Sequence, residues 1–184
     1  MVKILKNNQT MFVKLLLAVA LIVFAIVFRL LPHPANFTPV AAVAIFGGAL
    51  LPKKWALSLP LVVMITSDLV IGLHSLIWVT WGSFLAIAFF SGKYLHKIQP
   101  LYVGAASLAA SLFFFLTTNF GVWLEGRLYP LTAGGLLNCY YNAIPFFRNT
   151  LLGDLVFCGF LFGIYALVCR YALKSSLKIA SSKS

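Results

Sequence analysis

Three acidic residues, Asp68, Glu125 and Asp154, are the side chains of this sequence best suited to do chemistry. They are far apart in a chain that is 62% hydrophobic and only 9% charged, so lipid is the expected solvent for most of it. A carboxylate in lipid needs a partner charge or a watery cavity, and it commonly marks a functional site. Because the topology argued below brings all three acids to one face, we expect a polar pocket that opens there.

Apolar runs long enough to be helices must position these acids. The 184 residues leave room for about six membrane crossings of roughly 20 residues each. We predict an all-α protein that forms a single integral membrane domain over residues 1–184. The first apolar run is expected to be retained, because no small-residue cleavage site follows it. The expected helices cover residues 11–31, 40–51, 55–73, 76–92, 101–118 and 151–171.

The second of these helices is short for a membrane span. Its twelve residues reach only about 18 Å as a helix, whereas the hydrocarbon core is about 30 Å thick. Two explanations are open. Either the helix begins earlier, near Phe37, or the proline-rich segment 33–39 dips into the membrane, where protein or a wet cavity must surround it.

The basic residues predict the orientation of the chain. If the N-terminus is cytoplasmic, every lysine lies inside and only Arg29, Arg127 and Arg148 lie outside. This pattern predicts six transmembrane helices with both termini cytoplasmic. It also explains the net charge of +11 without a nucleic-acid partner. The inner basic residues are Lys3, Lys6, Lys14, Lys53, Lys54, Lys93, Lys97, Arg170, Lys174, Lys178 and Lys183.

The connection between the fifth and sixth expected helices, residues 119–149, is too long for an ordinary loop and too apolar for a solvated one. Long connections in compact proteins are commonly lids or binding loops. Its aromatic residues suit the headgroup level or the wall of an organic ligand site. We therefore expect short interfacial or re-entrant helices here, with Gly134-Gly135 as a hinge, capping the pocket.

The same topology predicts the residues of a ligand site. Four aromatic side chains are expected to pack against a small organic molecule, and five polar side chains are expected to orient it. The aromatic residues are Phe37, Trp123, Tyr140 and Tyr141, and the polar residues are Asn36, Asp68, Asn119, Arg148 and Asp154.

The polar residues also have structural interpretations, which the sequence leaves open. Asp68 could be paired with Arg29 or Arg148 simply to hold helices together. Asp154 could complement the helix dipole, because it lies in the first turn of the last expected helix. Arg148 could anchor the chain at the membrane interface or bind an anionic group.

Other chemistry finds little support in the sequence. His33 and His74 lack metal-ligand spacing and are more typical of polar helix ends, and Cys139 is more typical of a structural cysteine. No GxSxG, HExxH or P-loop motif is present. We therefore expect no cofactor, no metal and no enzymatic activity.

Three stretches together resemble a family of small bacterial integral membrane proteins. They are residues 29–48 with the motif HPxNFTP, Ser67-Asp68, and residues 143–154 with the motif IPFFRN. The resemblance covers roughly residues 20–170. That family is similar to the substrate-binding S components of energy-coupling-factor transporters, through its size, its six helices and an apolar lid over an outward cavity.

The resemblance implies a solute-binding or transport protein of the bacterial inner membrane. S components bind vitamins or metal ions from outside and topple in the membrane when docked to an ATPase-driven module. The AxxxA docking pattern of their first helix is absent, since Ala18, Ala20 and Ala25 have other spacings. The chain is thus expected to work with such a module, alone, or with another partner.

Two other functions compete with transport. In a structural subunit of a cell-envelope membrane complex, the polar residues would only pair with each other. In an intramembrane enzyme, Asp68 or Asp154 would act with His33, although no motif supports it.

Overall fold

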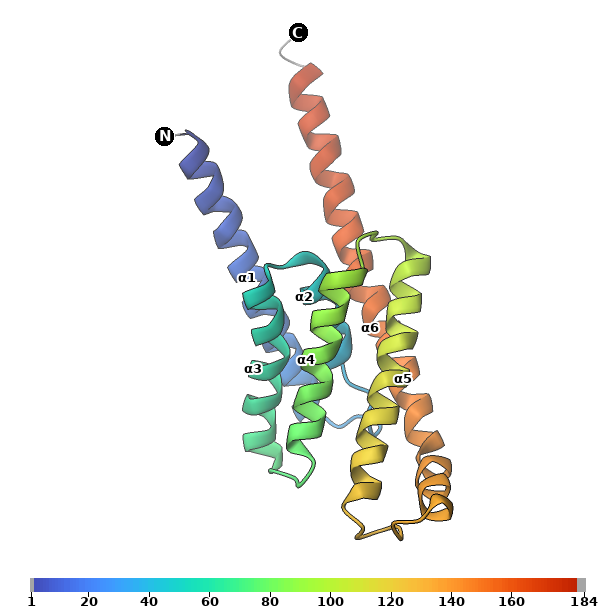
Figure 1. The fold of residues 1–184 in the computed structure, drawn as a ribbon. Helices are drawn as coiled ribbons and strands as arrows, with labels where there is room; N and C mark the ends of the chain where they lie inside the picture. The colour runs from blue at the N-terminus through green and yellow to red at the C-terminus, as the bar shows by residue number, and fades with distance from the viewer. Residues whose placement is uncertain (1, 182–184) are drawn as a thin grey trace.

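The computed structural model describes the backbone of residues 2–181 and the side chains of residues 16–170. Residues 2–181 form six helices and no strand, which confirms the all-α prediction. The helices run alternately up and down, and both chain ends lie at the same end of the bundle (Figure 1). The helices are α1 (Val2–Leu30), α2 (Val40–Leu50), α3 (Lys53–Ile71), α4 (Ile77–Tyr94), α5 (Pro100–Leu124) and α6 (Ala133–Ser181).

Three of the described helices, rather than six, are long and apolar enough to cross a membrane. They are Lys53–Ile71, Pro100–Leu124 and Ala133–Arg170, while Leu16–Leu30 and Val40–Leu50 are shorter apolar helices. Large apolar side chains also face outward along these spans, as expected of a surface that contacts lipid. They include Val62, Ile65, Leu69, Leu108, Leu112, Leu116, Val156, Phe160 and Ile164. The helix lengths are thus consistent with a membrane protein, and the prediction of six crossings goes further than they do.

Helix α2 is the centre of the bundle. All residues from Val40 to Gly48 are buried, as expected of a helix that is apolar on every side. Gly48 brings α2 into backbone contact with α4, because a Cβ atom at Gly48 would lie 2.3 Å from the Ala88 carbonyl oxygen. Its eleven residues span about 16 Å, so α2 covers only part of the bundle's length.

The proline-rich segment before α2 enters the bundle. Figure 1 shows the α1–α2 connection at mid-height, whereas the α3–α4 and α5–α6 connections lie at the lower end. The short second helix is therefore explained by a recessed segment, since α2 begins at Val40 and not near Phe37. Asn36 makes the turn with φ +64°, a left-handed conformation that asparagine adopts more readily than most residues.

The predicted lid over residues 119–149 is wrong. Helix α5 continues to Leu124 and α6 begins at Ala133, so that only residues 125–132 connect them. Thr132 caps α6, because its Oγ1 accepts a hydrogen bond from the Gly135 backbone N–H at 3.1 Å. A Cβ atom at Gly135 would lie 2.0 Å from the Pro130 carbonyl oxygen, so Gly134-Gly135 opens a helix instead of forming a hinge. Pro145 lies inside α6, as proline can where neighbouring helices pack in lipid.

Candidate functional site

A partly open cavity of about 730 Å³ lies at the end of the bundle opposite the chain termini. Its volume is within the range of roughly 300–1,000 Å³ that is typical of small-molecule sites. Every helix contributes to its wall, and the recessed α1–α2 segment supplies three polar residues. The lining residues are Arg29, Leu30, His33, Asn36, Thr38, Ala41, Met64, Val70, Ile71, His74, Thr80, Phe84, Phe114, Thr150 and Asp154.

Behind one wall of this cavity lies a closed ionic cluster. Arg29 of α1 and Asp68 of α3 form a salt bridge, in which Arg29 Nη2 lies 2.5 Å from Asp68 Oδ1. The indole N–H of Trp81 in α4 donates to Asp68 Oδ2 at 2.8 Å. Asp68 is only 1% exposed and does not line the cavity. Both of its oxygens are thus occupied, and the cluster joins α1, α3 and α4.

The other buried acid has no such charged partner. Asp154 of α6 is 2% exposed and lines the cavity. Its Oδ2 accepts a hydrogen bond from the Ser111 hydroxyl of α5 at 2.7 Å. Ser111 lies also 3.0 Å from the Ser107 carbonyl oxygen, so its single proton serves two acceptors. Within residues 16–170, Ser111 is the one hydrogen-bond partner of this carboxylate and no cation pairs with it.

The structure brings two of the nine predicted site residues to the cavity wall, Asn36 and Asp154. Asp68 stands next to the cavity, because its partner Arg29 lines it. Phe37 lies in a cluster of aromatic rings, with its ring centre 5.3 Å from that of Phe157. Among the side chains of residues 16–170, the predicted convergence of acids and arginines therefore occurs at one place, between Arg29 and Asp68.

Of three other predicted residues, Tyr140 joins α6 to α5, Trp123 joins α5 to the connection that precedes α6, and Asn119 bonds within α5. The Tyr140 hydroxyl donates to the Leu116 carbonyl oxygen at 2.8 Å, and the Trp123 indole donates to that of Pro130 at 3.0 Å. The Asn119 side chain donates to the Phe115 carbonyl oxygen at 2.8 Å. These contacts stabilise a helical hairpin outside the cavity. Tyr141 points away from it and is 73% exposed.

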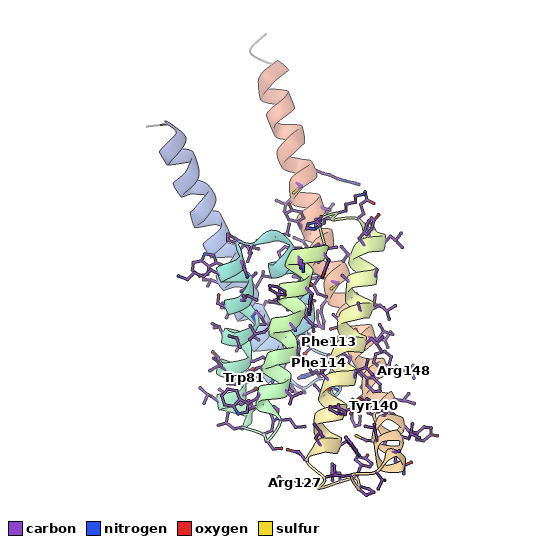
Figure 2. The ribbon with its side chains drawn as sticks, in the orientation of Figure 1. Trp81, Phe113, Phe114, Arg127, Tyr140 and Arg148 are labelled. Atoms are coloured by element: carbon purple, nitrogen blue, oxygen red, sulfur yellow. The ribbon has the colours of Figure 1, made fainter. Side chains whose placement is uncertain are left out.

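Arg148 is also outside the cavity. It is exposed, and Figure 2 shows it at the edge of the bundle opposite Trp81, the hydrogen-bond partner of Asp68. The neighbouring Asn149 side chain instead ties α6 to the recessed segment, by donating to the Ala35 carbonyl oxygen at 3.1 Å. The proposed dipole role of Asp154 is wrong, because α6 begins at Ala133 and Asp154 lies far from its first turn.

Several residues of this site were not predicted from the sequence. Thr150 precedes Asp154 by four residues and therefore shares its helix face, which is a signal that the sequence does contain. Ser111 lies in a run of small residues that suits either close helix packing or contact with a partner subunit, so the sequence does not mark it as a partner of Asp154. Trp81 had no signal, because its contact with Asp68 depends on how α3 and α4 are rotated against each other.

The described part of the chain contains no cluster of potential metal ligands. No group of three or more histidine, cysteine or acidic residues there could hold an ion. His33 and His74 both line the cavity, and the His33 Nδ1 atom is 2.6 Å from the Leu31 carbonyl oxygen. The wall instead combines hydroxyl, amide and imidazole groups with apolar side chains, a mixture that suits an organic molecule.

Comparison with known proteins gives a family and no function. No curated protein and no solved structure matches the chain. The profile of a family of unknown function (DUF6580) matches residues 9–177, which include all the residues of the cavity wall. The chain therefore belongs to the DUF6580 family.

Proposed function

We propose that this protein binds a small organic solute in the cavity and carries it across the bacterial inner membrane, in the manner of an energy-coupling-factor S component. Six membrane crossings with cytoplasmic termini belong to this proposal, and no covalent step is part of it. The observation that carries it is a cavity of about 730 Å³ with polar walls in a chain that is otherwise apolar. Burying that polar surface without a guest or water would be costly in lipid.

The positions of the basic residues favour this orientation. Lys53, Lys54, Lys93 and Lys97 lie at the start of α3 and around the end of α4, at the same end of the bundle as the chain termini. The cavity lies at the opposite end. If the lysine-rich end is cytoplasmic, as the distribution of positive charge predicts, the cavity faces outward.

The source of energy for transport has two alternatives: an ATPase-driven module that docks to this protein, or transport alone or with a different partner. Ala18 and Ala25 of α1 are buried against the rest of the bundle, at 2% and 0% exposure. They therefore serve packing within the chain, whereas Ala20 is exposed. The lack of an exposed AxxxA stripe favours transport alone or with a different partner over docking through that pattern to an ATPase-driven module.

A structural subunit of a cell-envelope complex is the second candidate function. The cluster of Arg29, Asp68 and Trp81 favours it, because both carboxylate oxygens of Asp68 have a partner within the protein, as a purely structural role requires. The cavity and the carboxylate of Asp154 remain unexplained by that role.

Mass spectrometry of small molecules that co-purify with the protein tests the proposal. The protein would be extracted in detergent from membranes that were incubated with a bacterial metabolite extract. Thr80→Phe fills the cavity from α4, because Thr80 lines it. Thr118→Phe is the matched control, since Thr118 is also a part-buried helical threonine but is not a lining residue.

We expect a solute in the parent protein and in Thr118→Phe, and its loss from Thr80→Phe. A solute that Thr80→Phe retains would exclude the cavity as its site. If the parent protein carries no solute above the level of Thr80→Phe, the transport proposal fails and the structural subunit gains.

A further inference from the structure

We infer that the cavity selects an organic cation, whose positively charged group binds the carboxylate of Asp154. The inference rests on the proposed function and names the chemical class of its solute. It begins with the contrast between the two buried acids. Asp68 has a guanidinium partner, whereas Asp154 has one neutral hydroxyl within the described side chains and faces the cavity.

When Asp154 is ionised, the charges around the cavity leave one negative charge uncompensated. Arg29 is the one lysine or arginine on the wall, and its charge is already neutralised by Asp68. Asp154 adds a second carboxylate beside this neutralised pair, and no second lysine or arginine lines the wall to balance it. A buried carboxylate without a partner is costly, and a cation in the cavity supplies that partner.

The hydrogen-bonding capacity of Asp154 points the same way. An ionised carboxylate offers about four acceptor sites, and Ser111 occupies one of them with a proton that it shares with the Ser107 carbonyl. An ammonium group brings up to three donors and a full positive charge. Such charge-assisted hydrogen bonds are about twice as strong as neutral ones.

The rest of the wall favours an organic cation over a metal ion. A metal would need further anionic or imidazole ligands beside Asp154, and no group of three such residues occurs in the described part of the chain. The aromatic rings of Phe84 and Phe114 line the cavity, with their centres 4.8 Å apart. Aromatic faces attract organic cations and also pack against their apolar parts. The volume of about 730 Å³ accommodates a molecule far larger than a bare ion.

Three probes that share a phenyl ring and differ in charge test the inference. They are 2-phenylethylammonium, 2-phenylethanol and phenylacetate, and their dissociation constants would be measured by titration calorimetry on the detergent-solubilised protein. We expect the ammonium to bind the parent protein about tenfold or more tightly than the alcohol, because its hydrogen bonds to the carboxylate are assisted by charge. Phenylacetate should bind most weakly.

Two variants connect this preference to Asp154. Asp154→Asn should remove the preference for the ammonium, while Glu125→Gln should retain it. Glu125 is the matched control, because it also carries a carboxylate but lies beyond α5 and outside the cavity wall. Thr150→Lys is a second test that holds even if Asp154→Asn fails to fold. Its side chain lies one turn before Asp154 on the same wall, so that it supplies an internal ammonium and should block the probe.

Several outcomes would overturn the inference. Equal binding of the three probes, abolished by Thr80→Phe, would leave the proposed function standing but would exclude charge selection. A parent protein that binds the ammonium no better than Asp154→Asn does would exclude Asp154 as the receptor. Stabilisation by sodium in place of the ammonium would exclude an organic cation, and a neutral or anionic co-purified solute would do the same.

Discussion

The two buried carboxylates of this bundle both lie among apolar side chains, but they differ in their hydrogen-bond and charge partners. Asp68 is enclosed by Arg29 and Trp81, from two other helices, and has no access to the cavity. Asp154 is held by one serine hydroxyl and faces the cavity. The comparison teaches that burial alone does not mark an acid for function, because a partner charge can account for it, as Arg29 does for Asp68. Under the proposed function, Asp154 is the acid that binds the guest.

The largest effect is expected when the enclosed acid loses its charge. Asp68→Asn leaves the part-buried guanidinium of Arg29, whose side chain is 15% exposed, without a counter-charge. Breaking a buried ion pair in this way costs about 3–5 kcal/mol. Reversible unfolding in mixed detergent micelles would measure this loss of the free energy of unfolding.

The double variant Arg29→Met/Asp68→Leu is the control for that loss. Removing both charges together with apolar replacements is often nearly neutral, so the double variant should regain most of the stability. If the double variant is as unstable as Asp68→Asn, the ion pair is not the cause and the contrast with Asp154 collapses.

A smaller loss of the free energy of unfolding is expected when the uncharged partner of Asp68, the indole of Trp81, is replaced. Trp81→Phe keeps an aromatic ring on α4 but removes the N–H that donates to Asp68 Oδ2. A hydrogen bond to a charged group contributes about 1.5–3 kcal/mol, and the free energy of unfolding should fall by that amount. Trp78→Phe is the matched control, because Trp78 is exposed on the same helix. Equal losses in the two variants would show that ring volume, and not the hydrogen bond, is what matters.

The next smaller effect is expected at Asp154, the acid that faces the cavity, when its hydrogen-bond donor Ser111 is replaced. Ser111→Ala removes the described donor to Asp154, at a site where the cavity can supply water or a guest instead. We expect a loss of about 1 kcal/mol in the free energy of unfolding, less than for Trp81→Phe. Affinity for 2-phenylethylammonium should change less than in Asp154→Asn, since the carboxylate remains. A loss as large as that of Asp68→Asn would mean that Asp154 is as enclosed as Asp68.

How far the sequence predicts this comparison depends on the kind of contact. The apolar runs predicted the existence of all six helices, and the lysines predicted that both chain ends lie together. Arg29 was one of two predicted partners for Asp68, because both lie near the same helix ends. The contact with Trp81 was out of reach, since it depends on the rotation of packed helices, which no local pattern determines.

The largest error of the sequence analysis, the lid over residues 119–149, has a local cause. Proline and paired glycines normally interrupt helices, so the segment was interpreted as a connection of short interfacial or re-entrant helices with a glycine hinge. In the structure Thr132 and Gly135 begin a helix, and Pro145 lies within it. Once α6 is known to include residue 148, the sequence does predict the separation of Arg148 and Asp154. Six residues correspond to a rotation of about 240° at about 100° per residue, so the two side chains point in different directions.

The smallest effect is expected for the predicted site residues that the structure places outside the cavity. Arg148→Ala and Tyr141→Phe change exposed side chains of α6, so the free energy of unfolding should move by no more than about 0.5 kcal/mol. The binding of 2-phenylethylammonium should also be unchanged, because neither residue lines the cavity. Both quantities can be measured beside Asp154→Asn in the same detergent. A loss of binding in Arg148→Ala without a loss of stability would place the solute on the outer face of α6, where an exposed arginine selects an anion. The difference between Asp68 and Asp154 would then concern the packing of the helices and not the binding of a solute.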